Sequence, residues 1–272
     1  MIRARLLILA LVVTTTFAAA APSFAWVDPV GLTQTVTRTP GETIANPPAF
    51  DLKPGSTGSL VTLLQEKLQA AGFFPGGIDG VYGQSTLAAV FAFQKLYDRE
   101  RSGVFRAEDW PLLDRQIEGP GPGPEPDRVE IDLARQIMYL IESERVTGVF
   151  PISSANGEPY RNAAGRVVNA STPEGRFTFR RTRDGWWRSY LGYLYRPFYF
   201  YGGYAIHGSR SVPPFPASHG CVRVEIDDMD FLATRLEVGM AIYLYGDDVS
   251  RDTLIEPPPP APPPVIPGLD TL

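Results

Sequence analysis

The stretch Ser218-His219-Gly220-Cys221-Val222-Arg223 decides how this chain is interpreted, because it holds the only cysteine among 272 residues. It also holds one of the two histidines, and the other, His207, lies a short distance upstream. A thiol has an ordinary pKa of roughly 8.5 and is mostly protonated at neutral pH, but an imidazole within hydrogen-bond reach can remove its proton. A single cysteine considered alone is more often a buried, unreactive side chain. The position of Cys221 near both histidines favours a nucleophile with its base.

The first 25 residues have the pattern of a secretory signal peptide. Arg3 and Arg5 precede an apolar stretch over residues 6–17, and small residues follow up to Ala25. The apolar stretch is too short to span a hydrocarbon core comfortably, and an uncleaved membrane anchor is the alternative. Cleavage after Ala25 removes two arginines and no acid, so the formal net charge falls from −5 to −7. We therefore expect an exported protein of the periplasm or cell wall, with no stable membrane insertion after cleavage and no nucleic acid as partner.

Composition divides the rest of the chain into two blocks. Residues 26–50 are predicted to form an extended leader, residues 118–127 a Gly/Pro linker, and residues 249–272 a proline-rich tail. The blocks between them, 51–117 and 128–248, are each long enough to bury the core of a modest domain.

The block 51–117 has helical periodicity. Leucines recur every four residues over 60–68, and Gly72 then provides a natural helix stop. Apolar residues with three- and four-residue spacing predict a second helix over 87–97, and a third short helix is expected over 107–113. The block is therefore predicted to be a small three-helix bundle.

The same block resembles the peptidoglycan-binding type 1 domain. The likeness is carried by Leu64-Gln65, Leu68, Gly72, the run from Ile78 to Gly83, Thr86, Ala89-Val90, Phe93-Gln94 and Trp110. The resemblance implies binding to wall glycopeptide but does not say which residues touch it. We expect the leucine and aromatic positions to be core, and Asp79 to hold its own turn rather than a ligand.

The block 128–248 predicts mostly strands. Two apolar runs separated by two residues are typical of a hairpin, further strands are expected downstream, and one late helix has the spacing of an amphipathic helix. The expected strands are 129–133, 136–141, 145–152, 176–180 and 240–245, and the helix is 226–236 with Asp227 as its N-cap. The predicted fold class is thus a multi-domain α and β protein, with a small three-helix bundle followed by a mostly-β domain with one late helix.

The second block resembles the L,D-transpeptidase catalytic domain, the YkuD-type fold. The likeness is carried by Thr172-Pro173-Glu174-Gly175, Ala205-Ile206-His207-Gly208, the cysteine stretch 218–223 and Val238-Gly239 before the last strand. It implies an enzyme that acts on peptidoglycan stem peptides and wall polymer. The implied substrate is a stem tetrapeptide ending in a diacid and D-alanine, and the implied acceptor is an amine of a neighbouring stem.

The resemblance and the residue chemistry together suggest the roles of the site residues. Cys221 is the expected nucleophile, and His207 is the expected base and later proton donor. The backbone N–H groups of His219, Gly220 and Cys221 are expected to stabilise the oxyanion, and Gly220 permits close backbone approach. The remaining supporting residues are Ser218, His219 and Gly208.

Three further residues are candidates for substrate binding. Arg223 is expected either to hold a substrate carboxylate or to pair with Glu225. Trp186 and Trp187 begin an aromatic-rich segment that runs to Tyr204, and they form either core or a lid over the stem peptide. This aromatic-rich segment and a polar insertion over residues 153–172 are two departures from the family pattern.

Four alternatives remain to be weighed. Hydrolysis of the same thioester would make the protein an L,D-carboxypeptidase, and the first block alone would suit a non-catalytic wall-binding protein. A papain-like peptidase has its cysteine before its histidine, whereas here the order is His then Cys. A zinc site from His207, His219 and Cys221 lacks a marked fourth ligand. We expect no metal and no cofactor.

Overall fold

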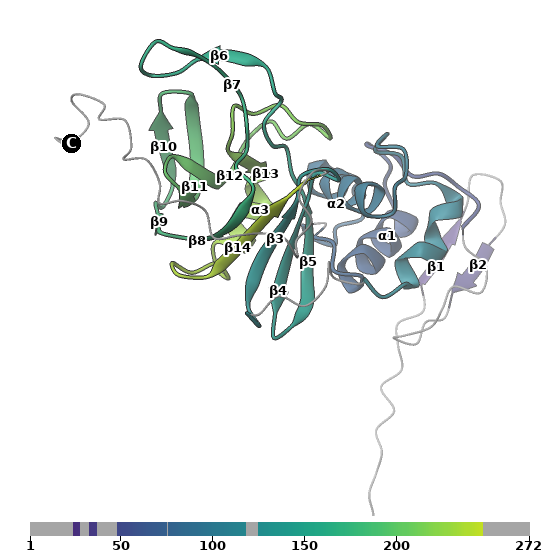
Figure 1. Ribbon diagram of the computed structural model, residues 1–272. Helices are drawn as coiled ribbons and strands as arrows, with labels where there is room; N and C mark the ends of the chain where they lie inside the picture. Colours follow the sequence, from purple (N-terminus) through teal and green to yellow (C-terminus); the bar gives the residue numbers. More distant parts are fainter. Residues whose placement is uncertain (1–23, 28–32, 37–47, 75, 118–124, 247–272) are drawn as a thin grey trace, which may run out of the picture. The chain divides into compact units, whose positions relative to one another are not determined.

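The computed structural model describes residues 24–27, 33–36, 48–74, 76–117 and 125–246 (Figure 1). Residues 1–44 and 45–272 form two compact units. In the first unit, Phe24–Val27 (β1) pairs antiparallel with Thr33–Val36 (β2). The following predicted segments lie wholly or mostly outside the described residues: the signal peptide 1–25, the leader 26–50, the linker 118–127 and the tail 249–272.

Three helical elements build the first part of the second unit. They are Ser59–Ala70 (α1), Gln84–Leu96 (α2) and Ala107–Asp114 (η1). The third is a 3₁₀ helix that contains Pro111, which has no backbone N–H to donate. Their shared core contains the predicted positions Leu64, Leu68, Phe93 and Trp110, and it also contains Phe105. The predicted three-helix bundle is therefore confirmed.

The turn between α1 and α2 is held by one buried amide. Gln65 is 1% exposed, and its Nε2 donates to Asp79 Oδ1 at 2.8 Å while its Oε1 accepts from the Gly80 N–H at 2.8 Å. Asp79 Oδ1 also accepts from the Val81 N–H at 2.9 Å. These bonds favour the carboxylate and lower the pKa of Asp79. Asp79 thus holds its own turn, as predicted.

The rest of the second unit contains two five-stranded sheets and a small hairpin. The first sheet has the order β5-β4-β3-β14-β8, with strands Arg145–Pro151, Ile137–Glu142, Arg128–Asp132, Ala241–Tyr245 and Gly175–Thr178. The second has the order β10-β11-β12-β13, with strands Trp186–Ser189, Gly192–Tyr201, Tyr204–Gly208 and Val222–Val224, and Arg181–Thr182 (β9) also pairs with β11. The hairpin joins Pro159–Arg161 (β6) to Val167–Asn169 (β7) and forms part of the polar insertion. The mostly-β architecture is confirmed.

One hydrophobic core joins the two sheets and the late helix. Side chains from both sheets meet there, among them Ile131, Leu140, Phe200, Ile206, Val222 and Leu244. The late helix, Ile226–Leu232 (α3), adds Met229 and Leu232. The helix is shorter than the predicted 226–236, and its N-cap is Glu225 instead of Asp227. Asp227 accepts a hydrogen bond from Ser85 Oγ at 2.6 Å instead of capping the helix.

The helical part packs directly on the first sheet. Phe73 forms a parallel bridge with Val149 of β5. Lys95 of α2 is 1% exposed, and its Nζ donates to the carbonyl oxygens of Gln136 and Ile152 at 3.1 and 2.9 Å. Burial lowers the pKa of Lys95 to about 7. Ile152 begins the segment that reaches the cysteine loop.

Candidate active site

Strand alternation separates the side chains of β12 and β13 onto two faces. Ile206 pairs with Val222 in the parallel register, and both are fully buried in the core. His207 and Cys221 are each one residue away from this pair, so their side chains point to the opposite face. On that face Cys221 packs against a small cluster of Leu194, Tyr199 and Ala205. The sheet therefore brings the two predicted catalytic side chains together.

The protonation state of His207 follows from its surroundings. The ring is 5% exposed, and its Nδ1 lies 2.9 Å from the carbonyl oxygen of Gly208. Because a carbonyl only accepts, we assign the hydrogen to Nδ1 and the lone pair to Nε2. Burial lowers the pKa of His207 to about 4; the bond to Gly208 raises it and the charge of Arg223 lowers it further. At neutral pH the ring is a neutral base.

The thiol of Cys221 is half-buried and protonated. Burial raises its pKa, and the backbone N–H of Ala205 and the charge of Arg223 offset part of that rise. In the described part of the chain, Sγ makes its hydrogen bond to the carbonyl oxygen of Gly203 at 3.8 Å, and not to His207. The resting site therefore holds a neutral thiol and a neutral imidazole. Catalytic hydrogen bonds often tighten only when substrate is bound.

Ser218 closes the loop before the cysteine. Its side chain is buried, and Oγ donates to the Cys221 carbonyl oxygen at 2.6 Å and accepts from the Gly220 N–H at 3.0 Å. The only proton of this hydroxyl is used inside the loop, so Ser218 orients the loop and cannot also donate to an acyl group.

Gly220 occupies a position that no other residue fits. Its φ is +153°, and an added Cβ would lie 2.5 Å from Cε1 of Tyr204 and 3.0 Å from the Ser171 carbonyl oxygen. Thr172 Oγ1 donates to the carbonyl oxygen of Gly220 at 2.9 Å. The absence of a side chain on Gly220 lets Tyr204 and Ser171 lie close to the loop, and the approach of the backbone to an oxyanion stays a prediction.

The polar insertion contacts the cysteine loop through a pair of aromatic rings and through backbone hydrogen bonds. The ring of His219 lies 4.7 Å from the ring of Tyr160 on β6. Ser153 exchanges backbone hydrogen bonds with Arg223, both at 3.0 Å. The Ser218 N–H donates to the Ser154 carbonyl oxygen at 2.8 Å. The insertion thus fixes both ends of the cysteine stretch.

Gly208 lies on the core face, below the site. An added Cβ would lie 2.9 Å from Cδ1 of Tyr195 and 3.1 Å from Cβ of Met229 on α3. The missing side chain lets α3 pack closely against β12, and the Gly208 carbonyl orients His207. Gly208 therefore supports the site by letting α3 pack closely and by orienting the His207 ring through its carbonyl oxygen.

Arg223 pairs with His207 in the strand register and follows Cys221 by two residues. Its charge acts on the pKa of His207 and of Cys221, and burial lowers its own pKa. The ion pairs of the described residues do not include Arg223. Glu225, the intramolecular partner considered above, accepts instead from Gln84 Nε2 at 3.2 Å. The pairing of Arg223 with Glu225 that the sequence offered is therefore not formed among the described residues.

The two tryptophans lie on opposite faces of the sheet. Trp187 pairs with Leu194, whose side chain belongs to the cysteine cluster. Trp186 pairs with Tyr195, and their ring centroids are 5.1 Å apart. Tyr195 bonds to Asp230 of α3 at 2.9 Å. Only Trp187 shares a face with Cys221.

Several residues near the thiol were not among the predicted site residues. Tyr199 packs in the cysteine cluster, and Tyr204 covers Gly220. The Gly202-Gly203 pair is a hairpin signal that pairs Tyr201 with Tyr204 and so brings Tyr199 next to Ala205. The remaining two are Tyr160 and Thr172, which contact the loop from the insertion and its end.

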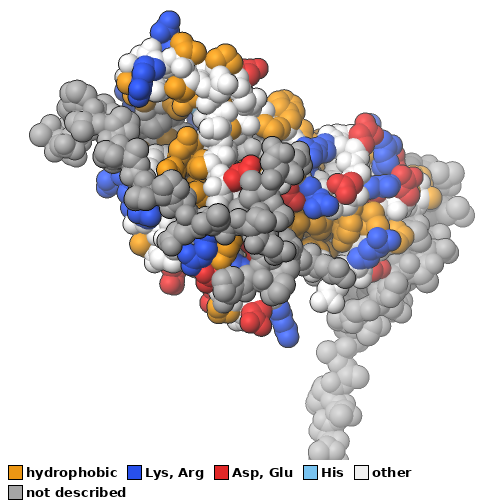
Figure 2. Space-filling view, in the orientation of Figure 1, with side chains coloured by type: hydrophobic (Ala, Val, Ile, Leu, Met, Phe, Trp, Pro, Cys, Tyr) orange, Lys and Arg blue, Asp and Glu red, His pale blue; other side chains and the backbone are white. Residues whose placement is uncertain are grey.

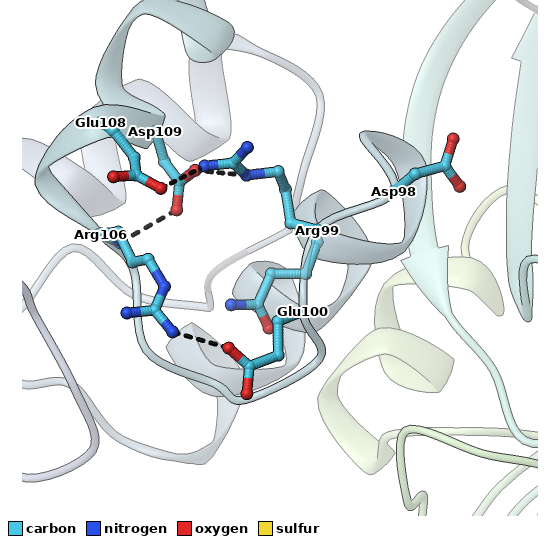
Figure 3. Close-up of a pocket in the computed structure, with 7 residues that line it drawn as sticks. Asp98, Arg99, Glu100, Arg106, Glu108 and Asp109 are labelled. Carbon is cyan, nitrogen blue, oxygen red and sulfur yellow. Dashed lines mark hydrogen bonds and ion pairs between the residues drawn. The ribbon is translucent and has the colours of Figure 1, made fainter.

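A pocket of about 270 Å³ lies between the end of α2 and the start of η1, away from the thiol (Figure 3). Its charged side chains bond to each other: Arg99 to Glu108 and Asp109 at 2.7 and 2.9 Å, and Arg106 to Glu100 at 2.6 Å. These pairs attach η1 to the loop after α2. The pocket is thus part of the helical scaffold.

No group of three or more His, Cys, Asp or Glu side chains within the described ranges converges as metal ligands would. None of the helices in this part of the chain has both the length and the apolar character needed to cross a membrane.

Two known protein families match parts of this chain. Residues 126–244 match the L,D-transpeptidase catalytic domain (YkuD), and residues 57–105 match the peptidoglycan binding domain PG_binding_1. No curated protein matches the chain.

Two solved structures are among those similar to this chain. An L,D-transpeptidase crystal structure from Xylanimonas cellulosilytica is 42% identical, with a TM-score of 0.68, over 73% of this chain and 100% of that one. An L,D-transpeptidase from Stackebrandtia nassauensis is 19% identical, with a TM-score of 0.42, over 75% of this chain and 98% of that one. From the first of these matches, the chain belongs to the L,D-transpeptidase family.

Proposed function

We propose that this chain is an exported L,D-transpeptidase whose nucleophile is Cys221 and whose base is His207. Membership of the family supports an enzyme of cell-wall cross-linking with peptidoglycan as substrate. The observation that carries the finer proposal is the shared face of β12 and β13, where a thiol lies one diagonal step from a neutral imidazole.

Acylation begins when the Cys221 proton passes to Nε2 of His207 and the sulfur attacks the carbonyl carbon between the diacid and D-alanine. The C–N bond then breaks, the imidazolium returns the proton to the departing amine, and a thioester and D-alanine result. Because burial disfavours both the thiolate and the imidazolium, we place the proton transfer together with substrate attack and not before it.

The oxyanion of this step needs backbone donors. The Gly220 N–H already donates to Ser218 Oγ. The candidates that remain in the loop are the N–H groups of His219 and Cys221. Loss of one such donor typically costs about 2.7–4 kcal/mol in the transition state, so the loop shape set by Ser218 and Gly220 contributes directly to the rate.

Arg223 is proposed to hold a carboxylate of the donor stem. Arg223 pairs with His207 in the strand register and follows Cys221 by two residues, and a planar guanidinium fork binds a carboxylate bidentately. The C-terminal carboxylate of D-alanine is the negative charge nearest to the attacked bond.

The second half of the reaction transfers the acyl group to an amine of a neighbouring stem. The amine attacks the thioester, His207 takes its proton, and the C–S bond breaks to regenerate Cys221. Attack by water instead would give the L,D-carboxypeptidase reaction.

The cellular placement is part of the same proposal. The signal pattern of residues 1–25 supports export to the periplasm or cell wall, and the family of residues 57–105 supports concentration of the enzyme on wall polymer. We propose 51–117 and 128–248 as the boundaries of the two domains. Mass spectrometry of the mature protein from the exported fraction should show a chain beginning at Trp26, and an intact Met1 would contradict cleavage.

The reaction is tested with the full chain from Trp26, a stem tetrapeptide and a free amine acceptor. Release of D-alanine together with a new peptide bond to the acceptor supports the transferase. If tripeptide were the only product, the carboxypeptidase alternative would be correct. A matched Val222→Ala variant, changed on the core face, controls for general damage by substitution near the thiol.

A further inference from the structure

We infer that Arg181 and Arg183 form a second carboxylate-binding site of the enzyme, which reads an acidic group on the acyl-donor peptide at a distance from the attacked bond. The inference rests on the proposed function, because it assigns these residues to the same donor. They are specificity-determining residues, separate from Arg223 at the reacting atoms.

The backbone register places Arg181 in line with the nucleophile. Arg181 pairs with Tyr199 of β11, Tyr199 pairs with Ala205 of β12, and Ala205 stands next to Cys221 beyond the Ile206–Val222 pair. Tyr199, Ala205 and Cys221 form one cluster. A single row across the sheet therefore leads from the thiol to Arg181.

The guanidinium groups of both arginines stack on aromatic rings of that face. The guanidinium carbon of Arg181 lies 4.1 Å from the ring centroid of Tyr199, and that of Arg183 lies 4.8 Å from the ring of Trp187. Stacking holds a guanidinium in place while its N–H edge stays available for hydrogen bonds. Each ring thus presents an oriented donor group toward the face of Cys221.

The charges of both groups are available to a ligand. Arg181 and Arg183 are exposed, and the ion pairs of the described residues include neither. Their neighbour Asp184 pairs instead with Arg196 at 3.0 Å. Figure 2 shows Lys and Arg side chains at the edge of the molecule where Figure 1 places β9. In a chain with a formal net charge of −5, this local positive surface favours an anionic ligand.

The distance between Cys221 and Tyr199 indicates that the acidic group belongs to the donor peptide. Tyr199 lies two strands from Cys221, which is about 10 Å at the usual 4.7–4.9 Å per strand. An extended peptide covers about 3.3 Å per residue, so the two residues that precede the diacid span about 7 Å, and an acidic side chain on one of them supplies the remaining reach to the Arg181 guanidinium. The occupant is therefore an acidic residue of the donor stem, bound while its other end lies at Cys221.

The experiment compares a stem tetrapeptide with the same peptide whose internal carboxylates are amidated. Binding is measured by calorimetry on the Cys221→Ala variant, and D-alanine release is measured on the wild-type chain. We expect Arg181→Gln and Arg183→Gln to weaken binding of the acidic peptide about tenfold, the low end for charge-assisted hydrogen bonds, with no change for the amidated peptide. The same variants should raise KM and leave kcat unchanged.

Arg210→Gln is the matched control. The Arg210 guanidinium also stacks on a tryptophan, 5.1 Å from the ring of Trp186, but Trp186 faces away from the thiol. The Arg210→Gln variant should bind both peptides with the affinity of the parent.

Two results would overturn the inference. One is equal binding of the two peptides by the parent. The other is a charge preference that appears only for the acceptor in the transfer assay. Binding preference without any D-alanine release would support the arginine site and contradict the proposed reaction, so the two failures are distinguishable.

Discussion

The two faces of β12 and β13 have different roles, although their residues alternate along the same short strands. The core face has Ile206, Val222 and Val224, all with no exposed surface. The opposite face has His207 and Cys221, both with pKa values displaced by burial. The alternation of strand side chains lets the sheet bury its stabilising residues one position away from reactive ones. Substitutions on the two faces should therefore have separable effects on stability and on turnover.

The largest expected effect is loss of turnover in Cys221→Ala. Without the sulfur no thioester forms, so D-alanine release should fall to the uncatalysed background. Removing a single sulfur from a half-buried position should leave the melting temperature close to that of the parent. Assays of both properties on the same preparation check the separation. An inactive variant that also failed to fold would not support it.

His207→Gln should lower kcat/KM by about 10²–10⁴, the usual contribution of a general acid–base. Glutamine keeps a donor for the Gly208 carbonyl but is not a base. Steady-state kinetics with the tetrapeptide measures the loss. A variant that retained full activity would exclude His207 as the base.

Ile206→Ala should show the reverse pattern. Replacing a fully buried isoleucine with alanine typically costs about 2–5 kcal/mol of unfolding free energy. Urea unfolding measures this loss. Below the transition the remaining folded enzyme should keep most of its kcat, since the side chain faces away from the thiol. A large fall in kcat with unchanged stability would contradict the division between faces.

The pH dependence of stability should also report His207. Its pKa is about 4 in the folded chain and 6.5 in the unfolded chain, so the unfolded state binds more protons between these values. The neutral ring therefore contributes about 3 kcal/mol above pH 6.5, and this contribution is lost as the pH falls toward 4. Comparison of urea unfolding at pH 7 and pH 4.5 should show a smaller drop for His207→Gln than for the parent. Identical drops would mean that the ring is not buried neutral.

The smallest expected effect distinguishes the two tryptophans. Trp187→Leu should raise KM for the tetrapeptide roughly fivefold, about 1 kcal/mol, because it removes an aromatic surface on the thiol's face. Trp186→Leu, on the other face, should leave KM unchanged. The opposite ranking would show that the hairpin of β10 and β11 covers the substrate from the α3 side.

Much of the fold could be predicted from local pattern. Helical spacing located α1 and α2, and alternating apolar runs located the hairpin of β3 and β4. The end of α3 was misplaced because Leu236 continues the helical spacing although the helix stops at Leu232. The backbone N–H of Leu236 still donates to the Leu232 carbonyl oxygen, and the Leu236 side chain is buried in the same core. Burial alone therefore does not mark where a helix ends.

The site was less predictable because it is assembled from distant segments. The motif around Cys221 indicated its loop, but the roles of Ser218 and Gly220 in closing that loop required their hydrogen bonds and φ values. Tyr160 and Arg181 reach the site through strand pairing and insertion geometry that no local pattern encodes. Trp186 and Trp187 lie on opposite faces of β10 because strand side chains alternate, but only the register with β11 shows that Trp187 is the one on the face of Cys221.

The most direct test of the account is the intact mass of the full chain quenched during turnover of a stem tetrapeptide. We predict a covalent adduct with the mass of the acyl tripeptide, located by digestion to the fragment that contains Cys221 and absent from Cys221→Ala. An adduct on any other residue, or one that persists in Cys221→Ala, would contradict the assignment of the nucleophile.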